Sequence, residues 1–323
     1  MILKRRSALL MSALIALFPL CAGAQTAYPT KPIRLVVGYA PGASTDLMAR
    51  FTAEHMGHLL NQRIVVENRP GADSALATRL VKNERPDGHT LLFTTLTLAF
   101  NLHAFKEPGY KLDDFVTIGA YGYTGNTLFV NTRSSGAKTL KEFIAYSQAN
   151  PGKITVSSLG KGSAPALAAN RFGTQAKMGW REIPFKSAAD AVAAVVAGTV
   201  DAYMAAPSTA MASMSQPDIA VFAVTGDVPS PALPGVPTFK QLGYDMPDSI
   251  SLGVFAPRDT PQPIIDKLRA ALEEAKLNDD NRKKVEAAGL QLYAGDWKNF
   301  DARLKASGDL YLADTRQLGI EPQ

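Results

Sequence analysis

The chain has 323 residues, of which 34 are lysine or arginine and 29 are aspartate or glutamate, and its formal charge is +5. The basic residues are scattered among acidic ones, which excludes the concentrated basic stripe of a nucleic-acid-binding surface. A chain of about 300 residues usually folds as two domains. We expect no nucleic acid among its partners.

Residues 1–24 have the three parts of a secretory signal peptide. Basic residues at 4–6 precede an apolar run at 8–20, and small residues ending at Ala24 follow it. The apolar run is too short to span a bilayer, so we expect cleavage there and a mature protein in the periplasm. The single cysteine, Cys21, leaves with this segment, so the mature chain has no thiolate for a disulfide, a nucleophile or a metal site.

From Ile33 onward, short apolar runs alternate with patterns of helical period, which is typical of α/β lobes built on largely parallel sheets. The proline-rich segment 227–237 suits neither a helix interior nor a central strand, so we expect an extended connection between the lobes there. The predicted strands lie at 33–37, 154–157, 183–185, 200–204 and 252–255, and the predicted helices at 45–60, 163–173, 188–197 and 263–275.

The segment 38–46 places a loop of small residues between a predicted strand and a predicted helix. A helix N-terminus has unpaired N–H groups and a partial positive charge, so it binds carboxylates without an arginine. Gly42 and Ala43 let an anion approach the backbone, while Ser44 and Thr45 add hydroxyl donors. Alternatively, Ser44 or Thr45 only caps the helix. The segment alone favours neither interpretation.

The segment 157–163 repeats this arrangement in what is expected to be the other lobe. Two such loops that face one cleft form a clamp for a carboxylate. Thr94 and Thr95 end a further predicted strand, and ligands of open α/β sheets lie beyond the carboxyl ends of the strands. We therefore expect all of these residues to lie at one cleft.

A series of motifs extends over nearly the whole mature chain in a fixed order. They read YPTKPIRLVV with PGASTD, VENRPGA, PDGHTLL, GS, PFK, GTVD and PGVPTF. Together they resemble the Bug family, the substrate-binding subunits of tripartite tricarboxylate transporters. The resemblance implies a two-lobed α/β periplasmic-binding-protein fold of the Venus flytrap type II, with a hinge between the lobes.

The resemblance also implies a function without catalysis. A small organic carboxylate (a dicarboxylate, a tricarboxylate or an aromatic acid) is captured between the lobes and delivered to the membrane subunits of the transporter. We expect lobe 1 at 25–128 plus 253–323, lobe 2 at 129–252, and a monomer. No cofactor, metal or catalytic residue is implied.

Motif matching carries the expected ligand-binding residues onto the two loops, the strand end and two further polar positions. The sequence departs from the usual family pattern at Ala40 and Ser187, and Ala164 stands near the place of a frequent histidine. These departures leave a bulkier or aromatic acid open as the ligand. The expected ligand-binding residues are Tyr39, Ala40, Pro41, Gly42, Ala43, Ser44, Thr45, Asp46, Thr94, Thr95, Ser158, Gly160, Gly162, Ser163, Lys186 and Asp201.

Several of these residues have a second interpretation. Lys186 either meets a second carboxylate or is solvated at the end of its strand. Asp201 interrupts an apolar strand, and since a buried carboxylate needs partners, it either contacts the ligand or makes structural hydrogen bonds. His55 and His58 share a helix face, but without companion ligands they predict a solvated surface and not a metal site.

Two other classes of function remain alternatives to transport. A serine hydrolase would need Ser158 or Ser163 as its nucleophile, but neither lies in a Gly-x-Ser-x-Gly elbow. All 4 histidines precede residue 104, which leaves no local base to activate these serines. A sensor that presents its closed form to a signalling receptor would use the same lobes and the same hinge motion.

Overall fold

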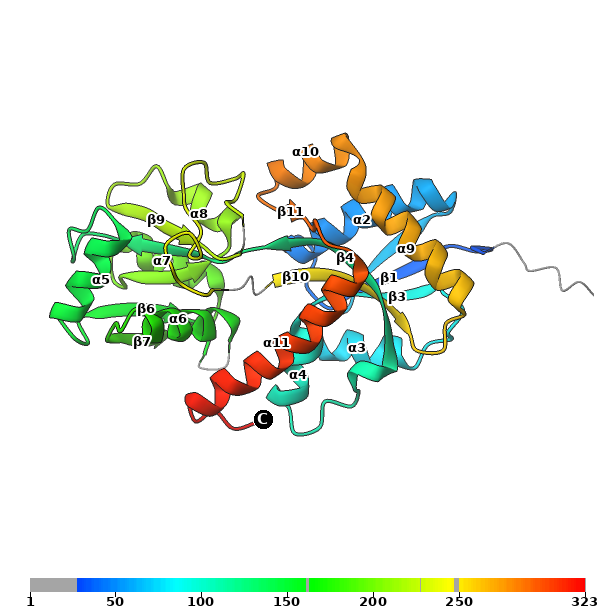
Figure 1. Ribbon diagram of the computed structural model, residues 1–323, viewed down its shortest axis with the longest axis horizontal. Coiled ribbons are helices and arrows are strands. Elements are labelled where there is room, and N and C mark those ends of the chain that lie inside the picture. Colours follow the sequence, from blue (N-terminus) through cyan, green and yellow to red (C-terminus); the bar gives the residue numbers. More distant parts are fainter. Residues whose placement is uncertain (1–27, 161–162, 227, 247–249, 323) are drawn as a thin grey trace, which may run out of the picture.

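The computed structural model describes residues 28–160, 163–226, 228–246 and 250–322, which form two α/β lobes side by side (Figure 1). The predicted signal peptide, with Cys21, and Gly162 of the second predicted loop lie outside the described residues. Each lobe is built on its own sheet. The prediction of a two-lobed α/β fold is therefore confirmed.

The first lobe has a six-stranded sheet in the order β11-β4-β10-β3-β1-β2. β1 pairs in parallel with β2 and β3, whereas β10 runs antiparallel to both β3 and β4. The sheet is thus mixed and not largely parallel as predicted, because the chain returns from the second lobe into the middle of it. The strands are β1 (Ile33–Val37), β2 (Ile64–Asn68), β3 (Thr90–Thr95), β4 (Phe115–Thr124), β10 (Ile250–Pro257) and β11 (Gln291–Leu292).

Helices cover both faces of this sheet, because its strands are apolar on both sides. On one face, Leu35 and Val37 pack in a buried cluster with Met48 of α2 and Leu268 of α9. Val36 lies between them and points to the other face. There it packs in a second cluster with residues of α3, α4 and α11. The helices of this lobe are α2 (Ser44–Leu60), α3 (Ala75–Lys82), α4 (Thr97–Ala104), the 3-10 turn η1 (Leu112–Asp114), α9 (Gln262–Leu277), α10 (Asp279–Ala287) and α11 (Trp297–Gln317).

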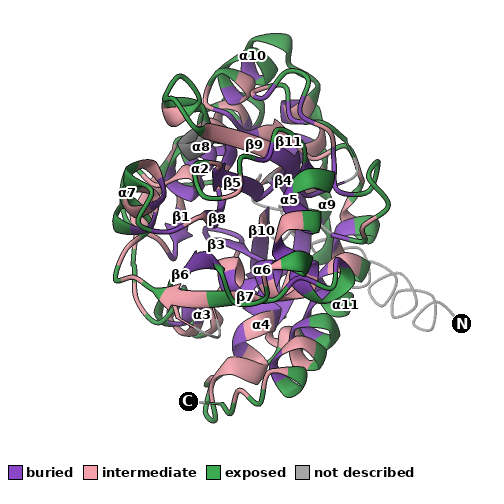
Figure 2. Ribbon diagram, turned by 90° about the vertical axis from the view of Figure 1, so that its left-hand side faces the viewer, coloured by how far each residue is buried: buried purple, intermediate pink, exposed green. Residues whose placement is uncertain are grey.

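The second lobe has a five-stranded sheet in the order β7-β6-β8-β5-β9. β6 pairs in parallel with β7 and β8, and β5 runs antiparallel to β8 and β9. The central strands of both sheets are buried, whereas the edge strands and the outer faces of the helices are partly exposed (Figure 2). The elements are β5 (Thr127–Asn131), α5 (Leu140–Ala149), β6 (Ile154–Ser158), α6 (Ala164–Gln175), β7 (Trp180–Pro184), α7 (Ala188–Ala197), β8 (Ala202–Ala205), α8 (Pro207–Ser213) and β9 (Ile219–Val224).

The chain first crosses between the lobes in the short segment that joins β4 to β5, and it returns into β10. At the first crossing, the Thr225 N–H donates to the Asn126 carbonyl at 2.8 Å, and the Asn126 N–H donates to the Thr225 hydroxyl at 2.8 Å. The expected lobe edges, after residues 128 and 252, lie a few residues late. They cut β5 and β10, whose apolar sequences show no break at the true crossings.

The proline-rich segment belongs to the second lobe. Leu233 is fully buried, and Phe239 just beyond the segment lies in the core of that lobe. The Val224 N–H of β9 donates to the Pro237 carbonyl at 3.0 Å. The prediction of a connection between the lobes is therefore wrong, because the prolines prevent regular structure without preventing the apolar side chains between them from packing.

Most of the predicted helices and strands are confirmed to within a few residues. α7 has the predicted bounds, and α2 begins one residue earlier than predicted. Among the described residues, no helix combines the length and the apolar character that a membrane span requires. The same residues contain no group of three side chains that could hold a metal ion.

Candidate functional site

A cleft of about 720 Å³ lies between the lobes, and residues of both lobes line it. The two predicted clamp loops therefore meet at one place. The cleft lies beyond the carboxyl ends of β3 and β6, as expected for open α/β sheets. The predicted site residues that line it are Tyr39, Ala43, Ser44, Thr45, Thr95, Gly160 and Ser163.

The first helix after β1 presents its N-terminus to the cleft. α2 begins at Ser44, and no side chain caps it, because the capping position is held by Ala43. The alternative in which Ser44 or Thr45 caps this helix is therefore wrong. The N–H groups of an uncapped first turn keep their hydrogen-bonding capacity and their partial positive charge, so this end of α2 is suited to an anion.

Asp46 shapes the loop and does not line the cleft. Its side chain is 2% exposed, and one carboxylate oxygen accepts hydrogen bonds from the Gly42 N–H at 2.9 Å and from Arg50 Nε at 3.0 Å. Asn68 donates to the other oxygen at 2.9 Å. Burial raises the pKa of Asp46, but the bonds from Arg50, Gly42 and Asn68 outweigh burial and hold that pKa below its ordinary value. The predicted ligand contact of Asp46 is thus replaced by a positioning role.

The loop before α6 is fixed by its own serines. Ser158 is buried and accepts a hydrogen bond from the Gly160 N–H at 3.1 Å, while the Ser163 hydroxyl donates to the Gly160 carbonyl at 2.7 Å. Gly160 has φ +109, which is strained for any residue with a side chain. The N-terminus of α6 has no side-chain cap. Ser163 therefore lines the cleft beside a second free helix end, whereas Ser158 holds the loop behind it.

Two further helices of the second lobe begin at the same cleft. Ala188, the first residue of α7, and Ala206, the capping residue of α8, both line it. No sequence signal selects these two residues, because alanine carries no polar group. The second lobe therefore presents several helix N-termini to the cleft.

Some predicted site residues lie away from the cleft. Ala40, Pro41 and Gly42 are exposed on the outside of their loop, and Lys186 is exposed beyond β7. None of these four residues is among the described residues that line the cleft. Thr94 is fully buried and exchanges a hydrogen bond of 2.7 Å with the Ser74 hydroxyl, because its side chain faces the interior behind the strand end.

Asp201 lies at the opposite end of the second sheet. It precedes β8 and accepts hydrogen bonds from the Thr155 N–H at 2.8 Å and the Thr155 hydroxyl at 2.7 Å, and Ser134 donates to it as well. Thr155 is near the start of β6, whereas the cleft lies beyond its end. The predicted ligand contact is therefore wrong, and Asp201 has the structural hydrogen-bond role that was its alternative.

A polar network on the floor of the first lobe supplies residues that sequence reasoning missed. The Tyr39 hydroxyl lies 3.0 Å from the hydroxyls of both Thr95 and Thr97, and it donates to Asp73 at 3.3 Å. The Asn101 side chain donates to the Asp73 carbonyl at 2.8 Å. Asp73, Thr97 and Asn101 all line the cleft. The sequence signal that could have identified these residues is their polar character just after Pro70-Gly71 and just after the end of β3.

Among the described residues, no positively charged side chain forms an ion pair with the carboxyl of Asp73. Desolvation by the surrounding walls raises the pKa of Asp73, although this residue is exposed, and the hydrogen bond from Tyr39 opposes that rise only in part. Burial and the charge of Asp73 in turn raise the pKa of Tyr39. Among the described residues that line the cleft, none is lysine or arginine. Among these described residues, backbone N–H groups and hydroxyls are groups that could donate to a bound anion.

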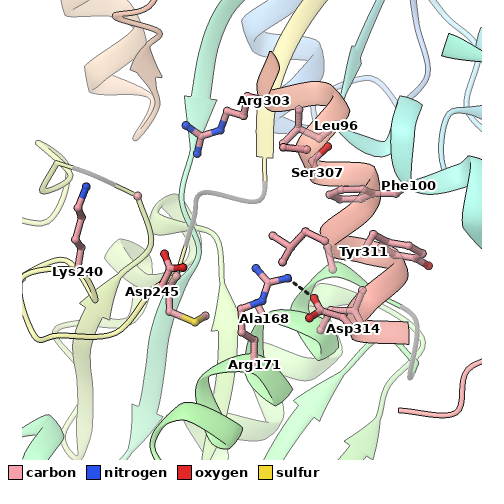
Figure 3. A pocket seen from close by; sticks show the side chains of 16 residues that line it. Leu96, Phe100, Ala168, Arg171, Lys240, Asp245, Arg303, Ser307, Tyr311 and Asp314 are labelled. Atoms are coloured by element: carbon pink, nitrogen blue, oxygen red, sulfur yellow. Dashed lines mark hydrogen bonds and ion pairs between the residues drawn. The ribbon is translucent and has the colours of Figure 1, made fainter. Parts of the chain in front are cut away.

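A second cavity of about 290 Å³ adjoins the cleft between α6, α11 and the segment 240–246 (Figure 3). It shares Phe100, Ala164 and Tyr311 with the cleft. The rings of Phe100 and Tyr311 are stacked, with centroids 5.1 Å apart. Arg171 of α6 and Asp314 of α11 form an ion pair across this cavity. The wall between the two spaces is thus aromatic, and both lobes contribute to it.

Comparisons with known proteins agree in pointing to receptors. The sequence matches the tripartite tricarboxylate transporter family receptors over residues 48–306. Protein BugT of Bordetella pertussis is 30% identical over 77% of this chain and 77% of its own length. The UPF0065 protein in the gbd 5' region of Cupriavidus necator is 29% identical over 82% of this chain and 81% of its own.

Solved structures lead to the same family. The periplasmic binding protein BugD is 26% identical with a TM-score of 0.73, covering 92% of this chain and 100% of its own. MatC from Rhodopseudomonas palustris, solved with bound malate, is 26% identical with a TM-score of 0.71, covering 89% of this chain and 99% of its own. The chain therefore belongs to the tripartite tricarboxylate transporter receptor family, and it is a solute-binding protein and not an enzyme.

Proposed function

We propose that the protein is a periplasmic receptor that captures a small organic carboxylate between its lobes and delivers it to the membrane subunits of a tripartite transporter. The ligand carboxylate binds the free N–H groups at the first turns of α2 and α6. The protein acts as a monomer, and binding requires no metal or cofactor. Closure of the lobes around the ligand produces the form that the membrane subunits recognise.

One observation carries this proposal. Uncapped N-termini of helices from both lobes line a single cleft, and among its described lining residues no lysine or arginine competes with them for an anion. Thr45 adds a hydroxyl beside the first of these helix ends, whereas the Ser163 hydroxyl already donates to the Gly160 carbonyl. A carboxylate has lone pairs enough to accept from both lobes at once, so its binding favours the closed arrangement.

The relatives support the same class of ligand. MatC, with malate bound, has the fold of this chain and a similar sequence. The predicted signal peptide at 1–24 and the periplasmic relatives support export. Amino-terminal sequencing of the protein from a periplasmic fraction tests this part, since cleavage after Ala24 gives a mature chain that begins at Gln25.

A thermal-shift screen tests the proposed ligand class. The purified mature protein is heated with aliphatic and aromatic carboxylates, each beside its uncharged amide. A ligand at 100 times its dissociation constant adds about 2.7 kcal/mol to the free energy of unfolding. We expect a raised melting temperature with at least one acid and none with its amide. Equal shifts with acid and amide, or stabilisation only by other solutes, would contradict a carboxylate receptor.

A further inference from the structure

Asp73 places an acidic group in a cleft that the proposed function assigns to an anion. Its side chain lines the cleft, and among the described residues it takes part in no ion pair. Apart from tyrosines, His103 and Glu321 are the other ionisable side chains among the described lining residues. No positive charge of the described residues in this part of the cleft neutralises an anionic ligand. The ligand instead meets the Asp73 carboxyl, which can accept further hydrogen bonds.

The backbone holds this carboxyl in a fixed place. Ala72, Asp73 and Ser74 have φ angles of 46, 45 and 74, a left-handed run that is uncommon for residues other than glycine. The Asn101 side chain fixes the Asp73 carbonyl at 2.8 Å. Strained backbone of this kind persists where surrounding contacts determine it, and it concentrates at ligand sites. The turn thus presents the Asp73 side chain to the cleft, although its left-handed backbone is energetically unfavourable.

The hydrogen bonding of Asp73 is incomplete. Tyr39 donates to one oxygen at 3.3 Å, a long bond, and shares its hydroxyl with Thr95 and Thr97. A carboxylate has about four acceptor positions, so most of the acceptor capacity of this cleft-lining side chain is unused among the described residues. A hydroxyl or an ammonium group of a ligand would fill this capacity, whereas a hydrogen or a methyl group at the same position would leave it unfilled.

We propose that Asp73 accepts a hydrogen bond from a hydroxyl or ammonium group of the ligand, so that the receptor selects carboxylates bearing such a donor over matched carboxylates without one. This inference rests on the proposed function, because it concerns the other end of a ligand whose carboxylate is held at α2 and α6. It makes Asp73 a specificity-determining residue and narrows the ligand class to hydroxy and amino acids.

An arrangement in which Asp73 donates a hydrogen bond to the ligand, instead of accepting one, makes a different prediction. A protonated Asp73 would donate to a second carboxylate of the ligand, in keeping with the pKa that desolvation raises. Asp73→Asn would then preserve a donor at this place, and the affinity for simple dicarboxylates would persist or increase relative to that for hydroxy and amino acids. The two arrangements are therefore separated by which substituent the wild-type protein prefers.

Isothermal titration with matched acids tests the inference. The probes are succinate, malate and aspartate; glutarate, 2-hydroxyglutarate and glutamate; and 3-phenylpropionate, 3-phenyllactate and phenylalanine. Within each carbon skeleton, only the 2-substituent changes. The variant is Asp73→Asn, which removes the charge while asparagine tolerates the left-handed backbone. Asp259→Asn is the control, because Asp259 is exposed and does not line the cleft.

On the skeleton that fits, we expect the hydroxy or amino acid to bind at least about 10-fold tighter than the unsubstituted acid, as for hydrogen bonds to charged groups. Asp73→Asn reduces this ratio to below about 3, and Asp259→Asn leaves it unchanged. Two outcomes overturn the inference but leave the proposed function in place. In one, the unsubstituted acid binds wild type as tightly as the hydroxy and amino acids of the same skeleton; in the other, the affinity ratio is unchanged by Asp73→Asn. Failure of all nine acids to bind contradicts the proposed function, and the inference with it.

Discussion

Arg171 on α6 and Asp314 on α11 form an ion pair that joins the second lobe to the first. The two side chains are only 19% and 14% exposed, so solvent screens the pair less than a surface pair. The same helix α6 begins at the ligand cleft with Ser163 at its cap. Opening of the lobes at this face therefore requires the ion pair to break, which couples cleft geometry to the C-terminal helix.

Arg171→Met is predicted to favour an opened arrangement of the lobes. Loss of the arginine leaves Asp314 half-buried without its partner, at a cost of about 1–3 kcal/mol to the joined form. Small-angle scattering should show a larger radius of gyration for the variant without ligand, and titration should show weaker binding. Arg282→Met removes an exposed pair within α10 and serves as the control. Identical scattering for Arg171→Met and the wild type would contradict the coupling.

Ser163→Glu is predicted to weaken carboxylate binding without unfolding the protein. Two negative charges about 5 Å apart repel by about 3 kcal/mol at an effective dielectric constant of about 20, which lowers affinity roughly 100-fold. Thr174→Glu adds the same charge at an exposed position near the other end of α6. Titration calorimetry compares the two variants. Normal binding by Ser163→Glu would show that the carboxylate lies elsewhere.

Asp46→Asn is predicted to lower the free energy of unfolding by about 1–3 kcal/mol at neutral pH, because the buried carboxylate holds Gly42, Arg50 and Asn68. Folding lowers the pKa of Asp46, so its contribution is present above its ordinary pKa of about 3.9 and is lost as the pH falls through the lower folded value. Urea unfolding should therefore show a large difference from wild type at pH 7 and a smaller one below pH 4. The same difference in the free energy of unfolding at both pH values would contradict a stabilising role for the charge of Asp46.

Asp73→Asn is predicted to stabilise the ligand-free protein. Folding raises the pKa of Asp73, so its ionised form costs stability above the ordinary pKa, and replacing it removes that cost. The ligand-free variant should melt at a higher temperature than wild type at pH 7, and the difference should disappear near pH 3. Tyr39, Tyr110 and Tyr311 surround this charge and stay neutral over that range, since burial raises the pKa of each.

Wild type and Asp73→Asn are compared at one pH, so that the two proteins differ only at this position. A variant that melts at the same or a lower temperature at pH 7 would show that Asp73 is already satisfied within the folded protein. Such a result would weaken the case for a ligand donor at this position.

The sequence predicted the elements and both clamp loops because each depends on local pattern. Apolar runs and small-residue loops before helices identified β1, α2, β6 and α6 within a few residues. Asp201 was included by motif matching, although it stands at the start of its predicted strand, and it holds Thr155 at the end of the sheet away from the cleft. Asp46 is held by Arg50 of its own helix and by Asn68 of a separate strand, and only the contact with Asn68 depends on tertiary packing.

The remaining site residues depend on tertiary packing that local patterns do not encode. Asp73 follows Pro70 and Gly71, and no local pattern selects it, although contacts with Tyr39 and Asn101 place it on the cleft floor. Tyr311 and Asp314 lie on a helix near the end of the chain that reaches the second lobe. Their positions follow from the path of α11, which no spacing in the sequence predicts.

The most direct test of the central claim is a crystal structure of the mature protein with the acid that the thermal-shift screen selects. The account predicts a closed cleft in which one ligand carboxylate lies about 2.7–3.2 Å from backbone nitrogens of the first turns of α2 and α6, directly or through one ordered water. A carboxylate held by lysine or arginine side chains, or bound to one lobe alone, would contradict it.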